Sequence, residues 1–221
     1  MKKYLSDLSY KSLKWFILGL TLLAFQATAW ETKKVVEKVV DPDTVKTVRW
    51  EGETDLDMLK QVRSDLDIPK DSKVKTLYVN LLSPGGPVVT SLEIARLVRE
   101  AHDKNGLTVE IHASALCASG CTFVLASGTP GSRYIAQYTL FLVHSIQAGG
   151  GWGPAVCVEH SDEAKSQEDK ARNILLDIMR DSYVRYTKTD PATAEKWLTC
   201  GNEQVGQGDL AVTLGFADKV E

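Results

Sequence analysis

The sequence predicts an α/β fold built on a parallel sheet. Three short apolar runs rich in β-branched and aromatic residues indicate buried strands. They cover Thr76–Leu82, Leu107–Ala113 and Leu140–Val143. Helical patterns lie between them, and a strand–helix–strand order is typical of parallel sheets with right-handed crossovers. Because sites in such sheets form at the carboxyl ends of strands, Gly86, Ser119 and His144 are candidate site residues.

The first 29 residues have the pattern of a secretory signal peptide. Four lysines precede the apolar core Trp15–Phe25, and Ala27-Thr28-Ala29 fits the small-residue cleavage rule. Eleven apolar residues are fewer than the roughly 20 that span a bilayer. We therefore expect cleavage after Ala29, and the alternative is an uncleaved segment that attaches the chain to a membrane.

The next stretch connects this segment to one domain, which we place at residues 44–221. Residues 30–43 are charged and valine-rich, which indicates an exposed arm or an added edge strand. Thr44–Trp50 alternates apolar and polar residues, as a half-buried strand does. Asp55–Leu66 follows as a helix, with Asp55 near its N-cap.

Two helices are expected between the three apolar strands. Pro87–His102 is amphipathic, with a proline suited to its first turn and Asn105-Gly106 as its stop. Gly120–Ser127 is short and would open directly after Ser119. His112 alternates with the apolar residues of its strand, so we expect it on the opposite face of the sheet.

The C-terminal third is predicted to be mainly helical. Its helices cover Asp162–Thr187, Pro191–Thr199 and Asp209–Leu214. The first is long and apolar on two sides, which suggests self-association as well as core packing. A glycine-rich loop with Trp152 precedes it and is expected beside the site.

Four sequence blocks carry a resemblance to a known family. They are Ser83-Pro84-Gly85-Gly86, then Ala118-Ser119-Gly120, then Ala126-Ser127-Gly128 with Gly131-Ser132-Arg133, and a strand that ends in His144. This order, with 25 residues from the serine to the histidine, resembles the proteolytic subunit of Clp protease. The resemblance covers roughly residue 44 to the C-terminus. It implies a fold of the Clp/crotonase kind, with repeated strand–strand–helix units around a parallel sheet.

The same resemblance assigns roles to the site residues. Ser119 would be the nucleophile and His144 the general base, while Gly86 and Gly120 would supply the oxyanion-hole amides. Physical chemistry favours these roles, since a serine hydroxyl needs an adjacent base and amides at a helix start face negative charge. No metal or cofactor is implied. The alternatives that remain open are Cys117 or Cys121 as the nucleophile and His160 as the base.

The third catalytic residue departs from the family pattern. Counting back from Gly215 in the closing turn places the family's aspartate at Glu203, next to Asn202. We therefore expect Glu203 or Asn202 to orient His144, or no residue to do so. Loss of the orienting aspartate in a Ser-His-Asp triad lowers turnover by roughly ten-thousandfold, so this position decides how active the site is.

The chain's four cysteines allow three pairings if the protein is exported to an oxidising compartment. Cys117 and Cys121 flank Ser119, and our hypothesis is that a bridge between them holds this turn. Cys157 and Cys200 would then form the second bridge. The alternative is four reduced cysteines that pack as small apolar side chains. A zinc site is disfavoured because the cysteines lack histidines at ligand spacing.

The net charge of the chain indicates which kinds of molecule it is not expected to bind. Without the first 29 residues, the chain's 26 basic and 29 acidic residues fall to 22 and 28. This acidic balance disfavours binding to nucleic acid and to anionic lipid.

The leading interpretation is an exported serine peptidase of Clp type, periplasmic or secreted, that cleaves peptides or proteins without an ATPase partner. A homo-oligomer would form through the Asp162–Thr187 helix, as the resemblance implies. The alternative function is a catalytically impaired peptide-binding or assembly module of the cell envelope. An esterase, a Ser–Lys peptidase and an acyl-CoA enzyme are less favoured readings, the last because coenzyme A is cytosolic.

Overall fold

A seven-stranded sheet forms the centre of the described chain in the computed structural model, which describes residues 42–69, 71–148, 156–161, 163 and 166–221. Its strands are β1 (Val45–Glu51), β2 (Thr76–Ser83), β3 (Thr108–Ala118), β4 (Arg133–Ile135), β5 (Leu140–Val143), β8 (Gln204–Gly206) and β9 (Lys219–Val220). The order β1-β2-β3-β4-β9 is parallel throughout. β5 adds in parallel to β3, and β8 pairs antiparallel with β5. The predicted α/β fold with a parallel sheet is confirmed.

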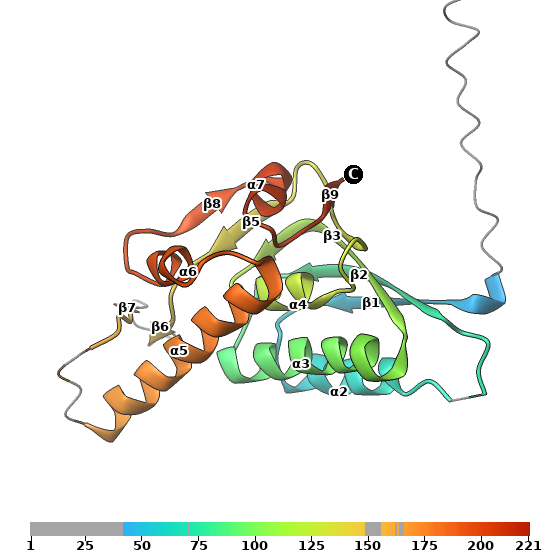
Figure 1. The fold of residues 1–221 in the computed structure, drawn as a ribbon, viewed down its shortest axis with the longest axis horizontal. Coiled ribbons are helices and arrows are strands. Elements are labelled where there is room, and N and C mark those ends of the chain that lie inside the picture. The colour runs from blue at the N-terminus through green and yellow to red at the C-terminus, as the bar shows by residue number, and fades with distance from the viewer. Residues whose placement is uncertain (1–41, 70, 149–155, 162, 164–165) are drawn as a thin grey trace, which may run out of the picture. The chain divides into compact units, whose positions relative to one another are not determined.

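Helices α2 and α3 run together along one side of this sheet (Figure 1). The helices are α2 (Leu56–Leu66), α3 (Val88–Asn105), α4 (Cys121–Ser127), α5 (Gln167–Thr187), α6 (Pro191–Trp197) and α7 (Gly208–Thr213). A 3-10 turn, η1 (Pro42–Thr44), precedes β1, and a small hairpin joins β6 (Gln147–Ala148) to β7 (Val156–Cys157). No helix within the described ranges is long and apolar enough to cross a membrane.

Local chemistry explains where the early helices begin and end. The Asp55 carboxylate accepts hydrogen bonds from the amides of Asp57 and Met58 at 2.9 and 3.0 Å, which caps α2. Gly106 ends α3 in the left-handed conformation, with a φ of 65°. α2 begins one residue later than predicted and ends at the predicted residue. α3 also begins one residue later than predicted, and it ends three residues beyond the predicted limit.

β3 is longer than predicted because it changes partner along its length. Residues Ile111–Ala113 pair with β4, whereas Leu116–Ala118 pair with β5. Ala115 lies between these segments with a φ of 59°, a left-handed kink that redirects the strand. The sequence-based limit at Ala113 misses this second segment, whose partner lies more than 20 residues later. As a result the strand that ends before Ser119 lies beside the strand that ends before His144.

Helix α5 starts later than predicted. It begins at Gln167 rather than Asp162, because Ser166 and Asp169 form a reciprocal capping box. The predictions for the signal segment, for residues 30–41 of the arm and for Trp152 fall outside the described residues.

A buried ion pair fastens the C-terminal segment to the sheet. The Arg133 guanidinium donates to the Asp218 carboxylate at 2.6 and 2.9 Å, and to the Gly215 carbonyl at 3.0 Å. The amides of Gly131 and Arg133 also donate to Asp218. Burial opposes ionisation, but the hydrogen bond and charge of Arg133 prevail and lower the pKa of Asp218.

Candidate active site

The carboxyl ends of β2, β3 and β5 open into one pocket of about 530 Å³. Gly86 follows β2, Ser119 and Gly120 follow β3, and His144 follows β5, and all four line this pocket. The structure therefore brings together the four residues for which the sequence predicted a nucleophile, a base and two oxyanion amides.

Ser119 lies on a tight turn between β3 and α4. Its φ is 55°, in the left-handed region that non-glycine residues rarely adopt. Its amide donates to the Leu142 carbonyl at 2.8 Å, and its carbonyl accepts from the Thr122 amide at 3.0 Å and the Thr122 hydroxyl at 2.7 Å. The backbone is thus fully engaged. The Ser119 hydroxyl donates no hydrogen bond to any described residue, which leaves it available to a substrate.

Two of the residues that line the pocket with Ser119 are the glycines predicted to supply the oxyanion amides. Within the described chain, neither the Gly86 amide nor the Gly120 amide has a hydrogen-bond acceptor. A Cβ atom on Gly86 would lie 2.9 Å from the Thr54 amide nitrogen, and one on Gly120 would lie 2.7 Å from the Thr54 hydroxyl. Side chains at these positions would therefore displace the backbone. Two unpaired amides beside a serine can stabilise a negatively charged oxygen.

His144 is held in one tautomer by the backbone. Its Nδ1 contacts the carbonyl oxygen of Ser145, and a carbonyl can only accept, so Nδ1 carries the proton. In a neutral ring, Nε2 is then the acceptor that a general base requires. Ser145 is fixed in turn, because its hydroxyl donates to the Val158 carbonyl at 2.6 Å.

The two candidates for the third residue lie at the start of β8. β8 pairs antiparallel with β5, and Val143 faces Gln204. The ladder ends at this pair, and continuing its register by one residue would bring Glu203 opposite His144. The Glu203 carboxylate accepts from the Gly201 amide at 3.2 Å in this structure, and the Asn202 carbonyl accepts from the Gln204 side chain at 2.7 Å. Neither residue lines the pocket. The topology favours Glu203 over Asn202.

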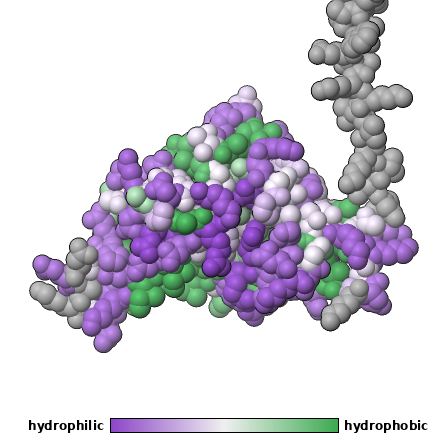
Figure 2. Space-filling view, in the orientation of Figure 1, coloured by the Kyte–Doolittle hydropathy of each residue, from purple (hydrophilic) through white to green (hydrophobic). Residues whose placement is uncertain are grey.

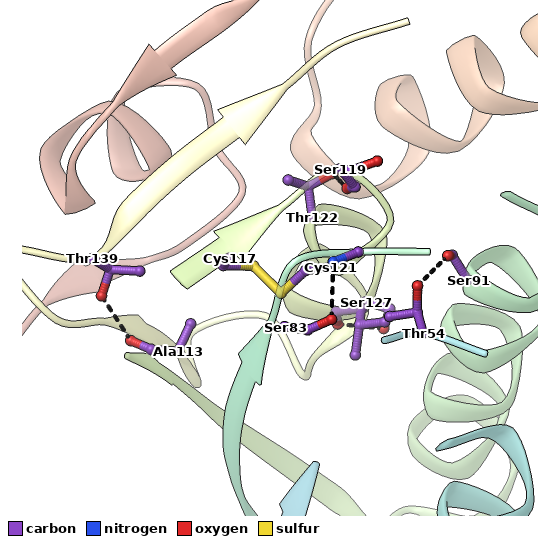
Figure 3. Close-up of a disulfide and its surroundings, with 12 residues drawn as sticks. Thr54, Ser83, Ser91, Ala113, Cys117, Ser119, Cys121, Thr122, Ser127 and Thr139 are labelled. Carbon is purple, nitrogen blue, oxygen red and sulfur yellow. Dashed lines mark hydrogen bonds between the residues drawn. A yellow bond between two sulfur atoms is a disulfide. The ribbon is translucent and has the colours of Figure 1, made fainter. Parts of the chain in front are cut away.

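The cysteines form two disulfides, Cys117–Cys121 and Cys157–Cys200, with Cα atoms 5.3 and 5.9 Å apart. Figure 3 shows Ser119 at the turn above the first bridge. As members of a disulfide, Cys117 and Cys121 have no thiolate to act as nucleophile, so that alternative is wrong for this structure. The alternative base, His160, is exposed and is absent from the pocket lining.

The sequence analysis did not identify the apolar wall of the pocket. Phe123 of α4 and Leu175, Met179 and Tyr183 of α5 line it. Burial raises the pKa of Tyr183 well above its ordinary value, so its ring presents a neutral surface. The helical spacing of the α5 residues indicated an apolar face, but only the packing of α5 against α4 shows that part of this face borders a cavity.

Comparison with known proteins gives a consistent picture. The family model for Clp protease matches residues 34–220. The chain is 25% identical over 141 residues to an ATP-dependent Clp protease proteolytic subunit 2 of Corynebacterium efficiens, covering 63% of this chain and 66% of the relative. It is 27% identical over 132 residues to an ATP-dependent Clp protease proteolytic subunit of Chlorokybus atmophyticus, covering 54% and 56%. The chain thus spans less than two thirds of the length of these relatives.

Proposed function

This chain belongs to the Clp protease family, and we propose that it is a serine peptidase in which Ser119 and His144 perform acyl transfer. The observation that carries the proposal is the shared pocket in which Ser119, His144 and the unpaired amides of Gly86 and Gly120 meet. A nucleophile, a base and an oxyanion site within one cavity are the parts that peptide hydrolysis needs.

The reaction follows from these positions. The Ser119 oxygen attacks the scissile carbonyl carbon and its proton passes to Nε2 of His144. The carbonyl oxygen becomes an oxyanion between the two glycine amides. The C–N bond then breaks, and His144 gives the proton to the departing amine. In the second half water attacks the acyl-enzyme carbonyl carbon and loses a proton to His144. The bond between that carbon and the Ser119 oxygen then breaks, the product acid leaves, and His144 returns the proton to Ser119.

The pocket wall supports a preference for apolar substrate side chains. Phe123, Leu175 and Met179 present hydrocarbon and thioether surface next to the reactive serine. Charged side chains would lose hydration there without a partner on these residues. We therefore propose peptides with a large apolar residue before the scissile bond as substrates.

We further propose that the protein acts outside the cytoplasm and without an ATPase. The support is the signal-like pattern of residues 1–29, together with two disulfides, which persist in oxidising compartments. An exported peptidase would not meet ATP, and its substrates would then be peptides and exposed loops.

An apolar groove between α3 and α5 supports self-association. Val89 and Ile178 line this groove and are 64% and 44% exposed, and Ile174 of α5 is 58% exposed. Figure 2 shows hydrophobic surface along the lower edge of the molecule, beneath these helices. The predicted role of the long helix in a homo-oligomer remains a proposal, which size-exclusion chromatography with light scattering would test.

Covalent labelling of the serine tests the enzymatic proposal. The purified protein is treated with a fluorophosphonate and its intact mass is measured, with Ser119→Ala as the control. We expect one adduct that the control lacks, followed by cleavage of peptides from a library. A folded wild-type protein that gains no adduct would favour the alternative function, a peptide-binding or assembly module that has kept the groove.

A further inference from the structure

Both disulfides lie close in sequence to the proposed catalytic residues, the first within the hydrophobic core and the second between partly exposed cysteines. Cys117 and Cys121 stand two residues before and after Ser119. Cys200 stands three residues before Glu203, and Cys157 faces Gln147, three residues after His144. We propose that the bridges position the catalytic groups, the first holding the nucleophile and the second holding His144 and Glu203 together. This inference rests on the proposed peptidase function.

The first bridge acts on a strained turn. Ser119 adopts a left-handed φ, which is unfavourable for an L-residue, so the surroundings must impose it. Gly85 packs so closely that a Cβ atom on it would lie 2.6 Å from Cβ of Ser119. The bridge joins the buried end of β3 to the first residue of α4, on both sides of the strained residue.

Helix α4 has no side-chain cap at its start, as is also true of α3 and α7. Side chains of Asp55, Ser166 and Asp190 cap α2, α5 and α6, but α4 begins after Gly120, which has no side chain to cap it. The Cys121 half of the bridge is the first residue of α4. The disulfide therefore adds a covalent constraint to a helix start that the hydrogen bonds from Thr122 to the Ser119 carbonyl also hold.

The second bridge closes a ring of contacts around His144 and Glu203. After His144, the Ser145 hydroxyl donates to the Val158 carbonyl at 2.6 Å and the Val158 amide donates to the Ile146 carbonyl at 2.8 Å. The disulfide then joins Cys157 to Cys200 in the segment that leads to Glu203. The amide of Cys200 also donates to Glu159 at 3.1 Å. The segment after His144 and the segment before Glu203 are thus linked covalently.

A positioning role and a purely stabilising role differ in what they predict. The stabilisation that a disulfide gives by restricting the unfolded chain grows with the loop that it closes. The Cys117–Cys121 bridge spans a sequence separation of only 4, against 43 for Cys157–Cys200. If the first bridge served stability alone, its loss would have little effect. A large loss of rate with a small loss of stability is therefore the signature of positioning.

The test compares two double variants, C117A/C121A and C157A/C200A, with Val62→Ala. Val62 is fully buried in α2, away from the pocket lining, so its truncation lowers stability without touching the site. Three quantities are measured for each: the fluorophosphonate labelling rate per folded molecule, the urea midpoint, and hydrogen exchange at named amides. The kcat and KM values for a cleaved peptide add a fourth, because mispositioning lowers kcat more than it raises KM.

We expect C117A/C121A to label at least about tenfold more slowly than wild type, since small displacements of reacting groups cost up to about a hundredfold. Its Ser119 amide, which donates to Leu142, should exchange faster. C157A/C200A should also label slowly, with faster exchange at the Val158 amide and a wild-type rate of exchange at Ser119. Val62→Ala should label at the wild-type rate despite its lower midpoint.

Each bridge can fail the test separately. A double variant that matches Val62→Ala in labelling and keeps wild-type exchange overturns the role of its own bridge. If wild type itself takes no label, the peptidase proposal fails, and exchange alone decides the inference. Unchanged exchange at Ser119 and Val158 would then overturn positioning, and faster exchange in the matching variant would support it.

Discussion

His144 and Glu203 lie directly beyond the same residue pair, because His144 follows Val143 in β5 and Glu203 precedes its antiparallel partner Gln204. Residues that face each other across such a ladder have Cβ atoms about 4.5–5.5 Å apart. A glutamate side chain can cover that separation. In this structure the Glu203 carboxylate accepts from the Gly201 amide, and the His144 imidazole donates to the Ser145 carbonyl. A rotation of the Glu203 side chain toward His144 would replace both of these hydrogen bonds.

Replacing Glu203 tests whether its carboxylate supports the base. Glu203→Gln keeps the shape of the side chain and removes the charge that stabilises the imidazolium. We expect the fluorophosphonate labelling rate to fall by roughly 10²- to 10⁴-fold. Asn202→Ala should label near the wild-type rate, because the hydrogen bond from the Gln204 side chain goes to the backbone carbonyl of Asn202 and not to its side chain. Equal rates in Glu203→Gln and wild type would show that the Ser145 carbonyl alone orients His144.

The oxyanion amides can be tested at Gly86. In Gly86→Ala the new Cβ would approach the Thr54 amide at 2.9 Å, so the backbone must move. We expect kcat to fall roughly 10²- to 10³-fold, as when one oxyanion donor is removed, with a smaller change in KM. Gly128→Ala is the control, since its Cβ would also be crowded, at 3.1 Å from Arg133 and Ile111, at the far end of α4. If both variants lose the same activity, the effect is general and the Gly86 amide has no special role.

The Arg133–Asp218 pair should make stability depend on acid pH. The pKa of Asp218 is lowered in the folded protein, whereas an unfolded aspartate has a pKa of about 3.9. The stabilisation that the ionised Asp218 gives to the folded state is therefore fully present above the unfolded pKa. It is lost as the pH falls through the lower pKa of the folded protein. Asp218→Asn should cost about 3 kcal/mol at pH 7, because it leaves a buried guanidinium without its counter-ion.

Urea unfolding at pH 7, 4 and 3 measures this difference. The difference in free energy of unfolding between wild type and Asp218→Asn should become smaller as the pH falls. Asp209→Asn, at an exposed carboxylate that accepts from Gln137, should change little at any of these pH values. If the difference in unfolding free energy between the two proteins does not change with pH, the charge of Asp218 is not its cause.

The two disulfides should differ in how readily they are reduced. Cys117 and Cys121 are both 0% exposed, whereas Cys157 and Cys200 are partly exposed. Exchange requires a thiolate to reach a disulfide sulfur, so a reductant added to the native protein should open Cys157–Cys200 first. Alkylation followed by peptide mass analysis would show the order. Simultaneous modification of all four cysteines would indicate that the turn around Ser119 opens in the native state.

Much of the centre of the fold could be predicted because its signals are local. A run of apolar residues closed by Pro-Gly-Gly ends β2 at Ser83, one residue beyond the expected limit, and β5 has the predicted bounds. The same local breaks placed Gly86, Ser119 and His144 at strand ends, and these residues share one pocket in the structure.

The features that the sequence did not reveal depend on distant partners. β8 is only three residues long and exists because Phe141, Leu142 and Val143 offer it an unpaired edge. The orientation of His144 by a neighbouring carbonyl depends on a ring conformation that no residue pattern encodes. Disulfide pairing was equally open, since four cysteines allow three pairings and only the folded chain brings particular sulfurs together.

The pairing of β5 with β3 on one side and β8 on the other also sets the order in which the candidate site is completed. Gly86, Ser119 and His144 are synthesised well before Glu203, and β5 gains its outer neighbour only when residues 204–206 arrive. A partly folded chain in which β8 has not yet paired has Ser119 and His144 but not Glu203 next to them in the sheet. On the proposed catalytic roles, a nascent chain would lack the carboxylate that supports its base until β8 joins the sheet.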